Sequence, residues 1–278
     1  MITSISNPRV KQVAQWRTKA KERRRDKVFL VEGWKMYEEA PERLIRDVYV
    51  SEGFQERLKQ RFGADSQMIR KLNRVGYEEV SEEVFRKMSD TQTPQGILAV
   101  LEQPHYSLQE IMRQAEGDGH RFLFLLLENL QDPGNLGTIL RTAEGAGITA
   151  VIMSEDTVDI FNPKVIRSTM GSVYRVPFLY EENLVKTVEF LHTHGVKTYA
   201  AHLQGKDYYD SFSFKEHTAF LIGNEGNGLT PELSGAASAF LKIPMEGRLE
   251  SLNASVAAAL LMYEAHRQRR CGDGALYG

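Results

Sequence analysis

The sequence has few of the features that mark exported or membrane proteins. Among its 278 residues there is one cysteine, Cys271, which excludes a disulfide within the chain. Residues 1–10 hold no apolar core of signal-peptide length, and purely apolar runs such as residues 122–127 are far too short to cross a bilayer. The seven histidines show no metal-ligand spacing. We therefore predict a cytoplasmic protein with no membrane span and no metal site.

The chain also has little net charge, but that charge is unevenly divided. Residues 1–102 carry +4 and residues 103–278 carry −6, which together give the net charge of −2. The positive charge is concentrated in one run of basic residues, namely Arg17, Lys19, Lys21, Arg23, Arg24, Arg25 and Lys27. Such a density suits contacts with phosphates. For a run considered alone, however, we favour the simpler interpretation, a solvated helix face.

Length and periodicity indicate two α/β domains, for which 42% hydrophobic residues provide enough material. In the first third, strand-like and helical segments alternate, at residues 28–31, 34–40, 44–50 and 55–61. Gln103-Pro104 and a polar stretch at residues 114–120 then interrupt the pattern. We expect a first domain at residues 1–102, a linker at 103–119 and a second domain at 120–278.

The second domain shows a clearer alternation of short apolar strands with helices. Strands are predicted at residues 122–127, 150–153, 176–179, 198–201, 219–222 and 241–243. Helices are predicted between them, for example at residues 136–146 and 184–192. Continuously apolar strands of this kind indicate a parallel sheet that is covered on both faces. In such sheets ligands bind beyond the carboxyl ends of the strands.

The first segment with candidate chemistry, residues 128–147, leads from a strand into an amphipathic helix. Asp132 to Asn135 have turn and N-cap character, and Arg141 falls within the helix between apolar neighbours. This segment alone supports two interpretations of Arg141 equally: it faces a substrate, or it lies at the helix edge and covers the sheet. Asn135 is equally a functional side chain or a helix cap.

The second segment, residues 221–229, has three glycines within six residues immediately after a strand. Glycine permits close backbone approach, so the loop either clasps a nucleotide-like cofactor or is a tight turn that needs glycine for its own geometry. The carboxylate of Glu225 within the loop favours the first interpretation. The G-x-x-G-x-G spacing is not that of the dinucleotide-binding fingerprint.

The third segment, residues 243–270, joins a short strand to a long helix whose first half is rich in alanine and uncharged. Ser251 and Asn253 lie at the helix entrance, where their oxygens cap the backbone or bind a ligand, and capping alone is the usual outcome. The small residues that follow allow close packing of another backbone. This is compatible with an intertwined core or with a helical dimer interface.

Taken in order and spacing, these three segments resemble the signature motifs of the SpoU/TrmH family of SPOUT methyltransferases. The resemblance covers the chain from about Phe122 to its end. Residues 1–102 resemble the substrate-binding domain that often precedes it, which is similar to kink-turn-binding ribosomal proteins. Residues 89–100, SDTQTPQGILAV, look like the family's junction between the two domains.

The resemblance implies a parallel α/β sheet with a C-terminal trefoil knot and a homodimer formed through the catalytic domain. It also implies that the loops holding Gly223, Ile243 and Leu252 bind S-adenosylmethionine largely through backbone groups. The residues assigned to the cofactor are Leu221, Ile222, Gly223, Asn224, Gly226, Ile243, Pro244, Met245, Ser251, Leu252 and Ala254. The polar active-site positions of the family match Asn135, Arg141, Glu225, Ser251 and Asn253.

The implied reaction is methyl transfer to a ribose 2′-hydroxyl of RNA. Because a guanidinium is effectively always protonated, we expect Arg141 to bind a phosphate or the developing alkoxide, with an RNA phosphate or Glu225 as proton acceptor. Asn135 and Ser251 would orient the ribose and Arg141, and Asn253 would support its loop. The basic run is then interpreted as an RNA contact.

The two-domain arrangement favours ribosomal RNA over transfer RNA as the substrate, although the nucleotide modified is not encoded in any motif. A non-catalytic RNA-binding protein of ribosome assembly is the main rival class. The presence of Arg141, Glu225 and Asn253 argues against that rival. A nicotinamide-dependent enzyme is a weaker rival, because the glycine spacing does not fit it.

Overall fold

The computed structural model describes residues 1–63, 66–249 and 251–272, with the side chains of residues 271 and 272, and so that of Cys271, outside the described part. The chain forms two compact units. The first contains Met1–Pro104 together with Asp159–Tyr174, and the second contains His105–Val158 together with Arg175–Gly278. Among the helices that the structure describes, none has the length and apolar character needed to cross a membrane.

The first unit is built on a four-stranded sheet in the order β1-β4-β2-β3. Its strands are β1 (Val28–Glu32), β2 (Ile45–Ser51), β3 (Glu78–Val80) and β4 (Ile97–Glu102). Strand β4 runs antiparallel to both β1 and β2, whereas β2 and β3 are parallel. The mixed sheet agrees with the α/β alternation predicted for this part of the chain.

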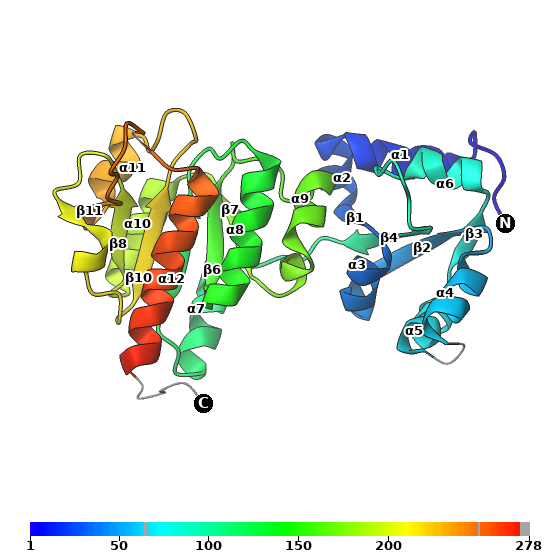
Figure 1. The fold of residues 1–278 in the computed structure, drawn as a ribbon, viewed down its shortest axis with the longest axis horizontal. Coiled ribbons are helices and arrows are strands. Elements are labelled where there is room, and N and C mark those ends of the chain that lie inside the picture. Colours follow the sequence, from blue (N-terminus) through cyan, green and yellow to red (C-terminus); the bar gives the residue numbers. More distant parts are fainter. Residues whose placement is uncertain (64–65, 250, 273–278) are drawn as a thin grey trace. The chain divides into compact units, whose positions relative to one another are not determined.

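Helices cover both faces of this first sheet (Figure 1). The helices of the first unit are α1 (Pro8–Thr18), α2 (Ala20–Asp26), α3 (Trp34–Glu39), α4 (Phe54–Phe62), α5 (Gln67–Val75), α6 (Glu82–Met88) and α9 (Pro163–Thr169). Helix α1 begins at Pro8, which has no backbone N–H that would need a partner. The side chain of Asn7 caps the helix by accepting the backbone N–H of Arg9. Val10 and Val13 of α1 pack with Phe85 of α6 in one fully buried core. Hydrophobic burial thus fixes this pair of helices on the sheet.

The second unit contains a seven-stranded sheet in the order β7-β6-β5-β10-β8-β11-β9, in which all neighbouring strands are parallel. Its strands are β5 (Leu123–Leu127), β6 (Ala150–Ser154), β7 (Phe178–Glu181), β8 (Lys197–Ala201), β9 (Asp207–Tyr208), β10 (Thr218–Ile222) and β11 (Ala239–Lys242). The central strands β5 and β10 are buried along their whole length. The predicted parallel sheet is therefore confirmed.

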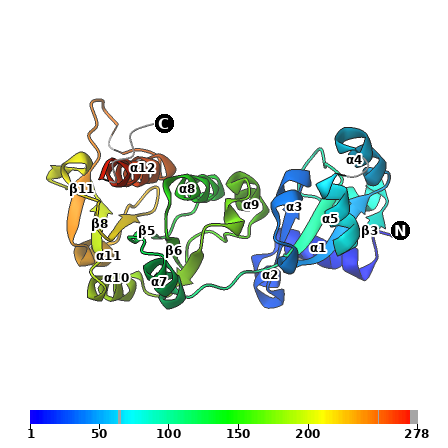
Figure 2. The same cartoon turned by 90° about the horizontal axis from the view of Figure 1, so that it is seen from below.

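Two layers of helices enclose this sheet. Figure 2 shows α8 (Pro133–Ala146) and α12 (Ala254–Gly272) on one face, and α7 (Leu108–Gly117), α10 (Leu184–Thr193) and α11 (Pro231–Ala236) on the other. The second layer packs through one cluster of buried residues that includes Ile111, Val188 and Leu233. The carboxyl end of β10 thus opens onto a loop at the edge of the sheet, where parallel sheets bind ligands.

Two segments pack in a part of the structure that their local sequence pattern does not indicate. The segment expected as a linker, residues 103–119, contains α7, whose Leu108 and Ile111 are buried in the second unit. The segment Asp159–Tyr174 packs in the first unit. There the ring of Phe161 lies 4.9 Å from that of Phe29, and Tyr174 donates its hydroxyl to the carbonyl of Met36.

Candidate active site

The first signature segment places a buried amide at the start of α8. Asp132 caps the helix by accepting the backbone N–H of Asn135 at 2.8 Å, and Pro133 takes the first helical position. Because Asp132 is the cap, the interpretation of Asn135 as a helix cap is wrong. The Asn135 side chain is buried and turned toward the glycine loop.

The second segment forms a tight loop after β10. Asn224 and Gly228 exchange two backbone hydrogen bonds of 3.0 Å each, and the Asn224 side chain accepts the N–H groups of Gly226 and Asn227. Gly228 has a φ of +69°. A Cβ added to Gly223 would overlap the backbone of Gly228, so no other residue fits there without moving the loop.

Glu225 joins this loop to the start of α8. Its carboxylate accepts the backbone N–H groups of Gln131 at 3.1 Å and Asp132 at 3.0 Å, and the side-chain N–H of Asn135 at 3.0 Å. Partial burial raises the pKa of the Glu225 carboxyl, but the hydrogen bonds from Asn135, Asp132 and Gln131 outweigh burial, so the pKa is lowered overall. Glu225 is therefore held as an anion whose oxygens already have donors.

The third segment is tied to the first by a second amide. Asn253 caps α12, because its Oδ1 accepts the backbone N–H and the hydroxyl of Ser255 at 2.9 and 2.6 Å. Its Nδ2 donates to Asn135 Oδ1 at 2.9 Å. A continuous chain of side chains, from Asn253 through Asn135 to Glu225, thus connects all three predicted motifs.

A cavity of about 360 Å³ opens between the glycine loop, the end of β11 and the start of α12. Of the residues predicted to bind the cofactor, nine line it, namely Ile222, Gly223, Asn224, Gly226, Ile243, Met245, Ser251, Leu252 and Ala254. Leu221 and Pro244 do not: Leu221 is fully buried within β10, and Pro244 is exposed outside the cavity wall. Glu225 also lines the cavity.

Sequence reasoning missed one wall of this cavity. The stretch from Ala201 to Gln204 begins at the last residue of β8, and Lys242 is the last residue of β11. The signal was present, because these residues lie at the carboxyl ends of strands in one parallel sheet, and such ends share one edge of the sheet. No glycine cluster drew attention to them.

Arg141 lies apart from this network. It is exposed on α8, does not line the cavity, and makes no hydrogen bond or ion pair with any residue that the structure describes. The structure therefore brings together Asn135, Glu225 and Asn253, adds Ser251 at the cavity wall, and leaves Arg141 free to contact something outside this chain.

The basic run in the first unit is divided by the structure. Arg23 is only 3% exposed and pairs with Asp159 at 2.5 Å, so it is unavailable to RNA, contrary to the sequence-based expectation. Arg17 donates to the backbone carbonyls of Lys87 and Ser89. The exposed members of the run are Lys19, Lys21, Arg24 and Arg25, and Lys27 is exposed at the end of α2.

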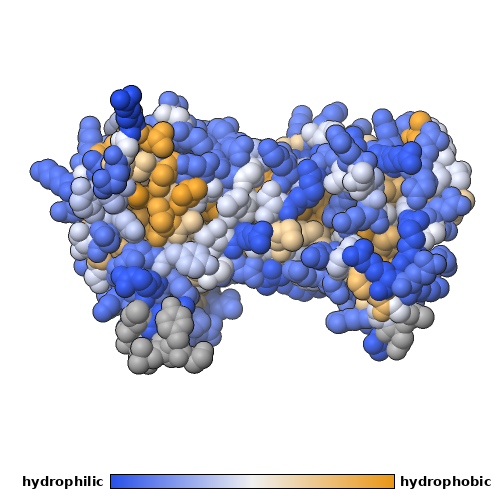
Figure 3. Space-filling view, viewed as in Figure 1, coloured by the Kyte–Doolittle hydropathy of each residue, from blue (hydrophilic) through white to orange (hydrophobic). Residues whose placement is uncertain are grey.

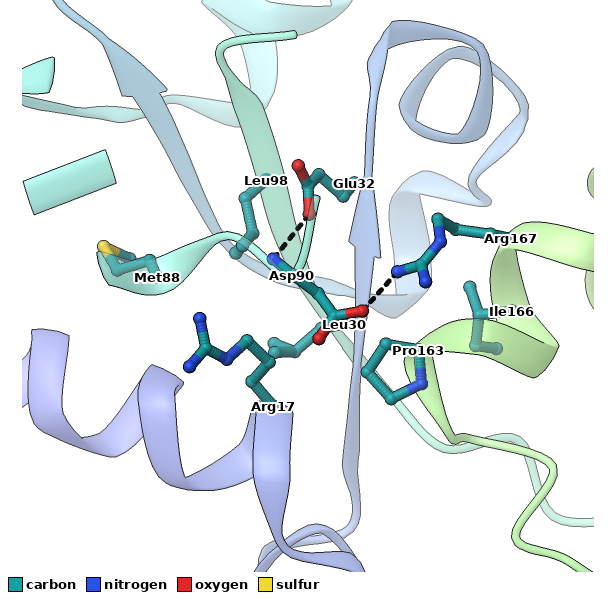
Figure 4. Close-up of a pocket in the computed structure, with 9 residues that line it drawn as sticks. All are labelled: Arg17, Leu30, Glu32, Met88, Asp90, Leu98, Pro163, Ile166 and Arg167. Atoms are coloured by element: carbon teal, nitrogen blue, oxygen red, sulfur yellow. Dashed lines mark hydrogen bonds and ion pairs between the residues drawn. The ribbon is translucent and has the colours of Figure 1, made fainter. Parts of the chain in front are cut away.

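The junction segment after α6 serves the fold of the first unit (Figure 4). The carboxylate of Glu32 accepts the hydroxyl of Ser89 at 2.5 Å and the backbone N–H of Asp90 at 3.0 Å. Asp90 in turn pairs with Arg167 of α9 at 2.5 Å. The small cavity among these side chains is closed by ion pairs and apolar residues, and it holds no candidate catalytic group.

Comparisons with known proteins match both parts of the chain to known families. Residues 122–263 match the SpoU rRNA Methylase family, and residues 7–99 match the MRM3-like substrate binding domain. The chain is 34% identical over 264 residues to the 23S rRNA (guanosine(2553)-2'-O)-methyltransferase RlmP of Bacillus subtilis (strain 168), covering 94% of this chain and 97% of that protein.

Solved structures give the same result. The AdoMet-bound rRNA methyltransferase from Sinorhizobium meliloti has a TM-score of 0.80 and 29% identity, covering 96% of this chain and 97% of that one. The SpoU methyltransferase AviRb from Streptomyces viridochromogenes, in complex with AdoMet, has a TM-score of 0.79 and 26% identity, covering 96% and 100%. The predicted activity, RNA 2′-O-methyl transfer with S-adenosylmethionine as cofactor, is confirmed by these relatives. With a family match over half its length and a relative matched almost end to end, this chain belongs to the SpoU rRNA methylase family.

Proposed function

We propose that this chain methylates a ribose 2′-hydroxyl of ribosomal RNA, with 23S ribosomal RNA as the first candidate substrate. The observation that carries the proposal is the chain of hydrogen bonds from Asn253 through Asn135 to Glu225 beside a cofactor-sized cavity. Similarity to the Bacillus subtilis enzyme extends over both units, which favours ribosomal over transfer RNA. The intact polar network argues against a non-catalytic protein.

The cavity fits S-adenosylmethionine. Its volume of about 360 Å³ lies in the range of small-molecule sites. Gly223 lines the cavity and has no side chain, and a Cβ there would overlap the backbone of Gly228. Backbone groups near Gly223, Ile243 and Leu252 would hold the cofactor, which supplies a methyl group on a positively charged sulfonium. The trefoil knot that the family resemblance implies belongs to this proposal, because the glycine loop and the segment before α12 line the same cavity.

Glu225 acts in this proposal as a positioning residue. A carboxylate that already accepts three donors and has a lowered pKa is a poor proton acceptor. Glu225 keeps the amide of Asn135 in one orientation, and Ser251 at the cavity wall faces the ribose.

Arg141 would complete the site of a second copy. Thr138 of α8 lines a groove of about 520 Å³ with Val256, Leu260 and Tyr263 of α12, and these three are large exposed residues. Figure 3 shows hydrophobic residues gathered over the beginning of α12. Arg141 lies one turn beyond Thr138, on the same side of α8. We propose that this face forms the homodimer interface and that Arg141 reaches across it to the RNA phosphate or developing alkoxide of the partner's site.

The first unit would supply RNA affinity in the cytoplasm. The exposed residues Lys19, Lys21, Arg24 and Lys27 can neutralise phosphates, whereas Arg25 already pairs with Glu22 and Asp26. Residues 1–102 then act as the RNA-binding domain ahead of the methyltransferase domain.

The experiment that tests this function maps 2′-O-methylation across total RNA from cells with and without the gene. We expect one ribose position in 23S ribosomal RNA to lose its methyl group. A lost methyl group in transfer RNA alone would move the assignment to the second substrate class, and an unchanged map would contradict the proposed function.

A further inference from the structure

The two tryptophans of the chain are in contrasting environments. Trp16 of α1 is 3% exposed, and its indole N–H donates to Asp26 Oδ2 at 2.7 Å. Trp34, the first residue of α3, is half-buried, and its indole N–H donates to no residue that the structure describes. Tryptophan side chains that serve only the core satisfy this donor, as Trp16 does. Trp34 therefore calls for a different explanation.

The ring of Trp34 lies among another exposed aromatic ring and two cations. Phe62, at the end of α4, is 37% exposed, and its ring centroid lies 5.0 Å from that of Trp34. The guanidinium of Arg61 lies 5.2 Å from the Trp34 ring and 5.4 Å from the Phe62 ring, and Lys35 Nζ lies 5.6 Å from Trp34. We call Trp34, Lys35, Arg61 and Phe62 the aromatic–basic patch.

The two cations of the patch keep their charge available. Neither Lys35 nor Arg61 forms an ion pair with any residue in the described part of the chain. Their cation–π contacts with the rings are weak at an exposed site. A partner that offers both an aromatic face and an anion can therefore replace these contacts without leaving a buried charge unpaired.

The backbone on both sides of Trp34 is fixed in advance. Gly33 has a φ of +95° and donates its N–H to the carbonyl of Ile97, and the N–H of Trp34 donates to Gln95 Oε1 at 3.1 Å. At the other end of α3, the buried ammonium of Lys71 donates to three carbonyls, those of Tyr37, Glu38 and Ala40. A helix held at both ends presents its first side chain in one position, which lowers the entropic cost of binding.

We propose that the aromatic–basic patch binds an unpaired base of the RNA substrate. The base stacks on Trp34 and Phe62, while Lys35 and Arg61 move from the rings to the flanking phosphates. Aromatic and guanidinium planes recognise splayed-out bases in this way, because every base has a π face and every nucleotide carries a phosphate. The proposal rests on RNA being the substrate, and it adds a contact separate from the basic run of α1 and α2.

The test measures binding of the full-length chain to a short single-stranded oligoribonucleotide and to a fully paired RNA hairpin. Stacking of a base should quench the emission of Trp34, and Trp34→Ala should weaken binding of the single strand by roughly 5- to 150-fold. Trp34→Phe should retain most of the affinity and lose the quenching. The paired hairpin should respond much less to either substitution.

Matched controls separate the patch from general effects on the surface or fold. Tyr77 is an exposed aromatic residue of the same unit, 40% exposed, so Tyr77→Ala should leave binding unchanged. Arg61→Ala should weaken binding more than Arg43→Ala, since Arg43 is exposed outside the patch. Because Arg61 is exposed, its variant keeps the test decisive even if Trp34→Ala unfolds.

The proposal is overturned if Arg61→Ala and a folded Trp34→Ala both bind the single strand as the unaltered chain does, or if that strand does not quench Trp34. Methyl transfer to total ribosomal RNA is measured with the same preparations. If the unaltered chain methylates RNA and the variants have the same KM for RNA, only the proposed role of the aromatic–basic patch is contradicted. An unaltered chain that methylates no RNA contradicts the proposed function.

Discussion

The side-chain amide of Asn135 donates to Glu225 across 90 residues of sequence, at a distance of 3.0 Å. The same amide accepts the N–H of Asn253 at 2.9 Å. Asn135 therefore uses its donor and its acceptor at once, which fixes which way the amide faces. An amide fixed in this way joins the glycine loop, the start of α8 and the start of α12 into one site.

The pH dependence of stability should show the Glu225 hydrogen bonds. A folded-state pKa below the ordinary value of 4.5 contributes stability that is present above pH 4.5 and is lost as the pH falls through the folded-state value. We expect the melting temperature of the unaltered chain to fall more steeply below pH 4.5 than that of Glu225→Gln. The exposed Glu232, changed to Gln, is the control and should keep the slope of the unaltered chain. Calorimetry on the acid side of neutrality measures all three, and equal slopes would refute this role of Glu225.

A comparison of two glycines should separate steric need from loop flexibility. Gly223→Ala puts a Cβ into the backbone of Gly228, and we expect it to abolish binding of S-adenosylmethionine. Gly235→Ala meets nothing within 4 Å and should leave binding intact, with a gain in stability of up to about 1 kcal/mol. Isothermal titration calorimetry gives both affinities. Normal cofactor binding by Gly223→Ala would show that the cofactor lies elsewhere.

Arg23 should matter to stability. It is buried and paired with Asp159, so Arg23→Ala leaves an unpaired carboxylate at a partly buried site and should lower the free energy of unfolding by about 3–5 kcal/mol. Arg24, its exposed neighbour, should change by less than about 0.5 kcal/mol when replaced by alanine. Urea unfolding followed by circular dichroism measures the difference. Equal stability of the two variants would contradict the buried ion pair.

The remaining basic residues should govern the salt dependence of RNA binding. We expect replacement of Lys19, Lys21 and Arg24 by glutamate to make the slope of log affinity against log salt concentration less steep. The slope should change by about 0.7–0.9 for each phosphate that is no longer neutralised. The experiment uses the full chain, because Asp159–Tyr174 packs in the first unit and a cut at residue 103 would remove its partners. Reversal of Lys164, on α9, serves as the control. An unchanged slope for the triple variant would mean that these residues form only a solvated face.

Local pattern predicted most of the strands but few of the long-range partners. The apolar runs at β5 and β10 were recognisable because both strands are buried on both faces. The predicted strand at residues 176–179 begins later, at Phe178, after Pro177, which has no backbone N–H. No local signal showed that Arg23 is buried, because its partner Asp159 lies 136 residues away.

The site was predicted by resemblance more completely than by pattern. Spacing alone left Asn135 and Asn253 as helix caps or functional groups, and the structure shows that Asn253 is both a cap and a link to Asn135. The isolated position of Arg141 was not foreseen, since a motif match gives the identity of a residue and not its distance from the other residues of the motifs. The wall from Ala201 to Gln204 lacked a glycine pattern and was missed.

Methyl transfer by the purified protein tests the central claim most directly. The full-length chain is incubated with radiolabelled S-adenosylmethionine and ribosomal RNA, and the RNA is digested to nucleosides. We predict label in a 2′-O-methylated nucleoside, its loss by at least about 100-fold in Arg141→Ala with unchanged cofactor affinity, and normal transfer by Arg113→Ala, an exposed arginine of α7. Label in a methylated base, or full activity of Arg141→Ala, would contradict the account.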